Sequence, residues 1–306
     1  MRLKSALRRG VAAAVIAGIV VSSGIPAYAA PWNIADGDIT VKAGDTEGTN
    51  WVSQGEKEDV KDTDTVITGE SKENTVTIDT SEGNVDVTFD DLKIDVSGKK
   101  EGNGSDDSPV RESNAAVTVQ GGGDAAIELD GDNKLKSGSN NAGLEKNKQE
   151  SKGTLTIKDD KGKDGSLTAE GGEGGAGIGG GAERTGSNIT IRGGTIEAVG
   201  GSNAAGIGDG AGRASGDTDD PNPGDLYICG DAEVTAKAGR SQMLDAKAPA
   251  IGGKYGEVPT ENLSDDEHKV TGGRLTRLNA DGTVMEGMGY DYTSVPTPLS
   301  LIHISE

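Results

Sequence analysis

Aromatic residues and cysteine are almost missing from this chain. Its 306 residues include one Phe, two Trp, five Tyr and one Cys, against 50 Gly. This composition argues against an ordinary globular core, in which large aromatic side chains fill much of the volume. The single cysteine, Cys229, excludes an internal disulfide bond. No histidine lies near it in the sequence to activate it, so we interpret it as a small core residue rather than a nucleophile.

Positive charge is also scarce. The chain has 30 Lys and Arg against 51 Asp and Glu, which gives a formal net charge of −21. Such a balance disfavours nucleic acid as a partner, because phosphate binding needs clustered Lys and Arg. It fits an extracellular protein that holds cations. High charge with low hydrophobicity also permits a disordered chain, but the regular alternation of Val, Ile and Leu with Thr favours half-buried strands.

A long apolar run is missing as well. The most apolar stretch, Val11–Val21, is shorter than the ~20 residues that a membrane-spanning helix needs. It follows four basic residues and precedes the small-residue motif Ala27-Tyr28-Ala29. This order is typical of a signal peptide over residues 1–29. We therefore expect a secreted or cell-surface protein whose mature chain has no membrane span.

The chain instead has a glycine-rich repeat. Ala-Gly-Ile-Gly occurs at 176–179 and at 205–208, and a looser copy occupies 249–252. Short runs of alternating aliphatic residues and Thr precede each copy. Glycine allows tight corners and close backbone approach, whereas it disfavours a helix. Self-similarity over a few tens of residues predicts stacked like units, and here these units form a solenoid of β-strands around a thin aliphatic core.

The composition divides the chain into parts. We expect a lead-in and cap at 30–64, the β-helix at 65–255 and a partial C-terminal extension at 256–298. Residues 299–306 differ from everything before them and resemble a translated sequencing adapter. We expect this tail to be an artefact that takes no part in the fold.

Five segments combine strands and corners in one order: 87–94, 125–135, 153–157, 165–169 and 176–180. Together they resemble the bacterial carbohydrate-binding β-helix domain over roughly residues 60–255. The resemblance implies an all-β, right-handed parallel β-helix (β-solenoid) of the polysaccharide-lyase-like kind. It also implies a secreted or surface-attached protein associated with binding plant polysaccharides and calcium. These segments are specific evidence for the architecture. They are weak evidence for the ligand, because most of their residues are structural.

Aspartates gather at three places along the chain. Calcium takes six to eight oxygen ligands, which such groups can supply, although none matches the pattern of an EF-hand. The alternative is a solvated acidic surface. In the first group the inward-pointing aliphatic residues would leave Asp86, Asp90 and Asp95 outward and Asp91 at a turn. The candidate ligands are Asp86, Asp90, Asp91 and Asp95; Asp124, Asp130 and Asp132; and Asp217, Asp219 and Asp220.

Few residues are suited to contact a glycan. Sugar rings stack on exposed aromatic side chains. The chain has few aromatic residues, and Trp51 and Tyr227 are our candidates among them. Arg192 directly follows an expected strand and is the third candidate; in a lyase of the pectate type such an Arg acts as the base beside bound calcium. The glycine run 175–181 resembles a phosphate loop, but no Lys-Ser/Thr and no expected helix follow it, which argues against nucleotide binding.

These observations favour a non-catalytic extracellular carbohydrate-binding or adhesion module. Its expected partner is a polysaccharide or a host or cell-wall glycan, and calcium is its one candidate cofactor. Two alternatives stay open. The first is a calcium-dependent polysaccharide lyase, and the second is a structural repeat stalk.

Overall fold

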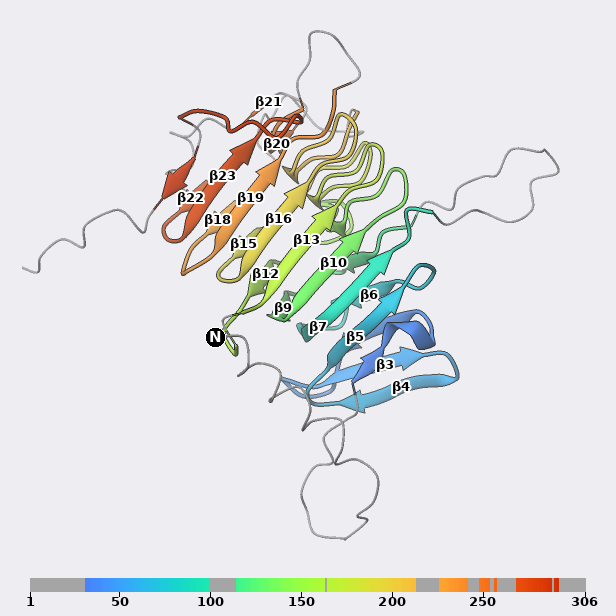
Figure 1. Ribbon diagram of the computed structural model, residues 1–306. Helices are drawn as coiled ribbons and strands as arrows, with labels where there is room; N and C mark the ends of the chain where they lie inside the picture. Colours follow the sequence, from blue (N-terminus) through green and yellow to red (C-terminus); the bar gives the residue numbers. More distant parts are fainter. Residues whose placement is uncertain are drawn as a thin grey trace, which may run out of the picture.

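The computed structural model describes residues 31–98, 114–162, 164–212, 226–241, 248–253, 256–257, 268–287 and 289–291. Within these ranges the chain is all-β, and its only helical element is one short 3-10 turn, η1 (Ile34–Asp36). No helix in this part of the chain is long and apolar enough to cross a membrane. The expected signal peptide and adapter tail lie outside the described residues. The strands form a 14-stranded and a 10-stranded sheet, both largely parallel (Figure 1).

The 14-stranded sheet has two halves, called face 1 and face 2 below, which β5 and β7 join because both strands run through the two halves. Face 1 contains β1 (Trp32–Asn33), β5 (Val66–Ser71), β7 (Val85–Asp95), β9 (Ala125–Asp130), β12 (Leu155–Lys158), β15 (Ile189–Ile191), β18 (Leu226–Ile228) and β22 (His268–Val270). Face 2 contains the ends of β5 and β7, then β10 (Asp132–Lys136), β13 (Ser166–Glu170), β16 (Thr195–Val199), β19 (Glu233–Lys237), β23 (Arg274–Leu278) and β24 (Tyr290–Asp291).

The 10-stranded sheet is called face 3. In spatial order it contains β21 (Gly256–Glu257), β20 (Ile251–Gly253), β17 (Ile207–Gly208), β14 (Ile178–Gly179), β11 (Leu144–Glu145), β8 (Val117–Gln120), β6 (Val76–Asp79), β2 (Ile39–Ala43), β3 (Asn50–Gln54) and β4 (Lys57–Asp62).

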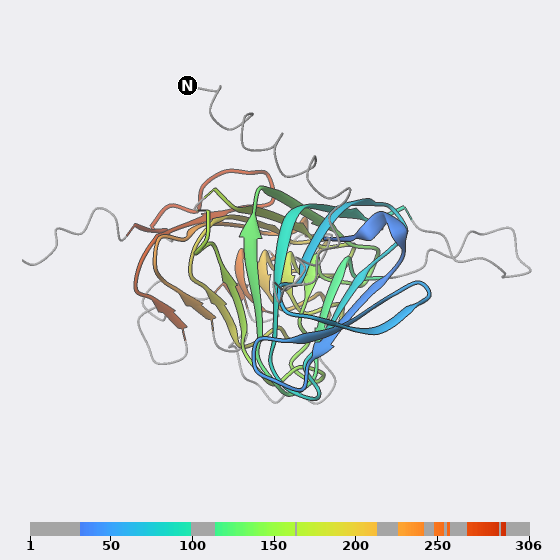
Figure 2. The ribbon, with the colours of Figure 1, turned by 90° about the horizontal axis from the view of Figure 1, so that it is seen from below.

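The chain passes from face 1 to face 2 to face 3 and then starts again, and we call one such passage a rung. Strands β12, β13 and β14 form one rung, and β15, β16 and β17 form the next. Parallel neighbours in the sheets lie about 4.8 Å apart. On face 3, Ile178 pairs with Ile207 and Ile207 with Ile251. The predicted stacking of these three isoleucines is therefore confirmed. Figure 2, seen from the end that bears β3 and β4, shows the sheets curling around the interior.

The corner between faces 1 and 2 differs from the sequence expectation at β7. The sequence suggests two strands around a turn at Asp91, whereas the structure has one 11-residue strand from Val85 to Asp95. Asp91 adopts φ +50°, which reverses the alternation of inward and outward side chains without breaking the ladder. Gly131 and Gly194 take positive φ angles at the same corner of later rungs, where a side chain is strained.

The core is a stack of inward aliphatic side chains. On face 2 alternate residues are buried, as in β13, where Leu167 and Ala169 are inaccessible and their neighbours are not. One inward column on face 2 shrinks along the stack and ends in a buried arginine. Its members in register are Ile94, Leu135, Ala169, Ala198, Ala236 and Arg277. This column therefore loses side-chain volume from Ile94 to Ala236 before Arg277 fills its last position.

Antiparallel strands close both ends of the parallel stack. At the N-terminal end β2, β3 and β4 form an antiparallel meander, and Trp32 Nε1 donates a hydrogen bond of 2.7 Å to Asp62 Oδ2 beneath it. At the other end β21 and β24 pair antiparallel with β20 and β23. Such pairs limit the unpaired sheet edge that would otherwise recruit another strand.

Candidate binding groove on face 2

A cavity of about 490 Å³ lies on the outer surface of face 2. The side chains of Ile94 and Leu135 belong to the core, so strand backbone forms its floor. Its walls are the outward residues of β5, β7, β10 and β13 together with the turn after β5. The lining residues are Glu70, Ser71, Lys72, Lys93, Ile94, Asp95, Lys134, Leu135, Lys136, Thr168 and Glu170. We call this cavity the lysine groove.

The strand register brings lysines of different rungs together in the lysine groove. Lys93 of β7 pairs in register with Lys134 of β10, so two ammonium-bearing residues are direct neighbours on adjacent strands. Lys136 stands two residues further along β10 and points to the same side, as alternation in a strand requires. Lys72 completes the set from the turn after β5. Outward like charges on adjacent strands destabilise a sheet, so this arrangement needs a compensating partner.

Carboxylates at the edges of the groove offset part of this charge. Lys93 Nζ lies 3.1 Å from Glu70 Oε1, and Lys136 Nζ lies 3.0 Å from Glu170 Oε2. The hydrogen bond to Glu70 raises the pKa of Lys93, and the hydrogen bond to Glu170 raises the pKa of Lys136. Lys134, between them, makes no ion pair with any described residue. The lysine groove thus offers lysine ammonium groups as hydrogen-bond donors. Its rim carries both lysines and carboxylates, and its floor is strand backbone.

A second, smaller cleft of about 330 Å³ lies where face 1 meets the N-terminal end. It is lined by five carboxylates and by no lysine or arginine: Asp45, Glu47, Glu82, Asp86 and Asp124. Two of the predicted calcium ligands, Asp86 and Asp124, therefore share one cleft. However, no three Asp, Glu, His or Cys residues in the described ranges lie close enough together to hold a metal ion.

The structure spreads the other predicted calcium ligands over the surface. Asp95 lies in the lysine groove, where its Oδ1 accepts hydrogen bonds from the backbone and hydroxyl of Ser97. Asp91 Oδ1 accepts the backbone N–H of Asp132 at 3.0 Å, which ties successive corners together. Asp90 and Asp130 are neighbours in register. The third group, Asp217, Asp219 and Asp220, lies outside the described residues. Calcium binding stays a prediction.

Arg192 is held by a carboxylate on face 1. Its Nη2 lies 2.6 Å from Asp160 Oδ2, and this hydrogen bond lowers the pKa of Asp160 and raises that of Arg192. Glu128, buried beneath, accepts the backbone N–H groups of Asp160 and Lys161 at 2.8 and 2.6 Å. This network orders the turn after β12. It keeps the guanidinium in an ion pair rather than poised as a base.

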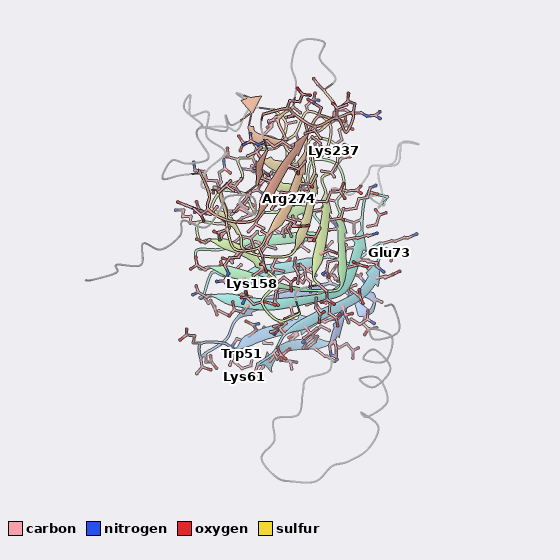
Figure 3. All side chains as sticks on the ribbon, turned by 60° about the vertical axis from the view of Figure 1, so that its left-hand side comes forward. Trp51, Lys61, Glu73, Lys158, Lys237 and Arg274 are labelled. Atoms are coloured by element: carbon pink, nitrogen blue, oxygen red, sulfur yellow. The ribbon has the colours of Figure 1, made fainter. Side chains whose placement is uncertain are left out.

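The two aromatic candidates lie apart from each other. Tyr227 points outward from β18 and is half-buried, as alternation predicts. Trp51 lies on the outer side of the N-terminal meander, paired in register with Lys42 on one side and Lys61 on the other. Lys61 Nζ is 5.8 Å from the centre of its ring, and Figure 3 shows the two residues side by side at this end. Neither aromatic residue lines the lysine groove.

Sequence reasoning missed the lysines of the groove. The signal was available, since Lys93, Lys134 and Lys136 all occupy polar positions of alternating strands. Their proximity needs the register of β7 with β10, which the repeat spacing alone does not specify. Comparison of the chain with family models, with curated proteins and with solved structures finds no match to any of them.

Proposed function

We propose that this chain is a secreted, right-handed parallel β-helix that binds an anionic polysaccharide, without cleaving it, in the lysine groove of face 2. The right-handed, closed coil is supported by the order of the three faces along the chain. Each strand pairs in parallel with its counterpart one rung later, and a crossover between parallel strands is right-handed in nearly all proteins.

The observation that carries the binding proposal is the pairing of Lys93 with Lys134. The chain as a whole has a net charge of −21, yet one cavity of about 490 Å³ is lined by four lysines against three carboxylates, Glu70, Asp95 and Glu170. Two like charges in register weaken the sheet, and an anionic ligand relieves this repulsion. Carboxylates or sulfates of an acidic glycan are suitable partners, because each accepts hydrogen bonds from ammonium groups.

The geometry favours a polymer over a single small anion. Successive rungs lie about 4.8 Å apart, so Lys93 and Lys134 present two cations on neighbouring rungs. Thr168 and Glu170 continue the groove on the next rung and can hydrogen-bond sugar hydroxyls. A linear acidic glycan lying along the stack would meet one polar side chain at each rung.

Catalysis and calcium have no part in this proposal. A lyase needs a free base, and Arg192 is engaged with Asp160 at 2.6 Å. The oxygen-rich cleft at Asp86 and Asp124 suits the ligand preference of calcium, but no described group of three carboxylates is close enough to hold the ion. A chelator arm in the binding experiment tests calcium directly.

The test is affinity electrophoresis and calorimetry with polygalacturonate, alginate and chondroitin sulfate, and with uncharged cellulose oligomers and xylan for comparison. We expect binding to the acidic polymers, weakening as salt is raised, and no unsaturated uronide product. Lys134→Gln should weaken binding about tenfold or more, because it removes a charged hydrogen bond.

Lys237→Gln is the matched control. Lys237 stands in the same outward column as Lys136, through Glu170 and Val199, but outside the groove. Equal losses in both variants would mean that charge alone, rather than the groove, attracts the glycan. Release of an unsaturated product would support the lyase hypothesis instead. Absence of binding to every polymer would contradict the proposal and favour the hypothesis of a structural stalk.

A further inference from the structure

A fully buried lysine lies at the beginning of the glycine-rich part of face 3. Lys146 directly follows β11, and its side chain has no exposed surface. Counting on from the paired residues of β8, β11 and β14, Val119 holds the corresponding position in the rung before and Gly180 holds it in the rung after. A position that is aliphatic or without a side chain in the neighbouring rungs therefore carries an ammonium group here.

The ammonium group of Lys146 has few partners. Its Nζ donates one hydrogen bond, of 3.3 Å, to the carbonyl oxygen of Ser151, and it forms no ion pair with any residue in the described ranges. A lysine ammonium has three N–H donors. Burial lowers the pKa of Lys146 to about 8, while the negative charge of Asp124 acts in the opposite direction. A buried cation with unused donors is costly unless something compensates for it.

Two residues next to Lys146 have buried hydroxyl groups that also make no hydrogen bond within the described part of the chain. They belong to Ser151 and Ser187, which are 0% and 2% exposed. Ser151 is the residue whose carbonyl meets Lys146. Ser187 lies opposite Lys146, because Asn147 and Gly186 form an antiparallel bridge and the next pair outward is Lys146 with Ser187. Opposite residues of an antiparallel pair project to the same side.

We propose that Lys146, Ser151 and Ser187 form an internal binding site for one small monovalent anion of the halide class, with chloride as the natural occupant. The three side chains offer an ammonium group and two hydroxyl donors, all of which one halide can accept. A water molecule would also accept hydrogen bonds, but it would add no negative charge to that of Asp124, which forms no ion pair with Lys146. Because all three side chains are buried, an occupant of this site has to be small, which favours a halide over carboxylates and phosphates.

The first experiment follows denaturant unfolding of the whole chain as sodium chloride or sodium bromide replaces sodium gluconate at constant ionic strength. Gluconate is too large to enter the core. We expect stability to rise with halide concentration and to saturate, as ligand binding to the folded state requires. Lys146→Met should abolish the halide response, and the control Lys148→Met, at an exposed lysine two residues away, should keep it. An equal free energy of unfolding in chloride and in gluconate would contradict the proposed anion site.

The second experiment tests the anion site without Lys146→Met, in case that variant does not fold. Ser151→Ala and Ser187→Ala each remove one hydroxyl donor, and the halide concentration at half saturation should rise roughly 3- to 10-fold in each variant. Crystals grown in bromide should show an anomalous scattering peak beside Lys146 Nζ. An unchanged midpoint in both serine variants, or a water molecule in place of the bromide peak, would contradict the proposal.

Discussion

Face 3 is built in two different ways along the stack. In its early strands, β2, β6 and β8, at least two inward aliphatic residues pack in each strand, as Val76 and Ile78 do in β6. In its later strands, β11, β14 and β17, only two residues pair, and just one of them is aliphatic. On face 3, therefore, the early rungs interlock through side chains, whereas the later rungs are held together largely by backbone.

The later rungs need glycine because successive backbones touch. A Cβ placed on Gly172, Gly201 or Gly239 would overlap the carbonyl oxygen of the glycine one rung before it. None of these three glycines requires a positive φ angle. These three glycines, each of which precedes a copy of the Ala-Gly-Ile-Gly repeat, therefore serve close approach between rungs at this corner. The difference teaches that one coil can be stabilised by side-chain packing at one end and by backbone contact at the other.

The largest expected effect comes from filling the backbone contact. Gly201→Ala should destabilise the fold by about 3 kcal/mol or more, since the new methyl group meets backbone that cannot move independently. Gly122→Ala is the matched control, because nothing lies within 4 Å of its added Cβ. Chemical denaturation measures both variants. Similar stabilities would show that the later rungs are looser than the structure implies.

The early rungs should respond to removal of side-chain volume. Ile78 has no exposed surface, so Ile78→Ala should cost about 2–5 kcal/mol and Ile78→Val about 0.5–1.5 kcal/mol. Val60→Ala provides the comparison, since Val60 is 40% exposed on β4. If Ile78→Ala were as mild as Val60→Ala, side-chain packing would not be what holds face 3 together there.

Lys146 lies on face 3 where side-chain packing gives way to backbone contact. Its burial predicts that the free energy of unfolding depends on pH. Its pKa in the folded chain is about 8, below the ordinary 10.5. Between these values the unfolded state binds more protons, so the free energy of unfolding should rise as the pH rises, by at most about 3 kcal/mol. Denaturation of the wild type and of Lys146→Met in gluconate buffer isolates this contribution. Parallel pH profiles for the two proteins would refute it.

The smallest effect on stability is expected in the lysine groove. Lys134 is exposed and makes no described ion pair, so Lys134→Gln should change the free energy of unfolding by less than about 0.5 kcal/mol. The sign should be stabilising, because the variant removes the repulsion from Lys93. Thermal unfolding checks this. A clear loss of stability would mean that Lys134 supports the sheet and is not free to serve a ligand.

Much of the fold could be predicted from the sequence. Alternation along each strand identified the inward residues, and the repeat of Ile178 and Ile207 in Ala-Gly-Ile-Gly indicated stacked corners. The continuity of β7 through Asp91 was not foreseen, because an aspartate at positive φ looks like an ordinary turn residue in sequence. Lys146 was also missed, since nothing local distinguishes a buried lysine from a solvated one.

The candidate site was predicted less well, for a physical reason. The sequence directed attention to aspartates and aromatic residues, such as Asp86 and Trp51, whose chemistry is apparent from residue type. The lysine groove depends on the neighbours across strands, and a shift of one residue in register would turn Lys134 inward. Residue type indicated possible ligands, while register decided which side chains share a cavity.

By itself the sequence determined that this chain stacks short β units on a thin aliphatic core, because periodic Ile and Gly leave few other ways to bury apolar surface. Only the tertiary structure decided that lysines of separate rungs meet in one groove and that Lys146 is buried next to Ser151 and Ser187. The inward and outward positions of a strand follow from its local residue pattern, which the sequence shows directly. Contacts between rungs instead depend on loop lengths and strand register, which involve residues that are tens of positions apart.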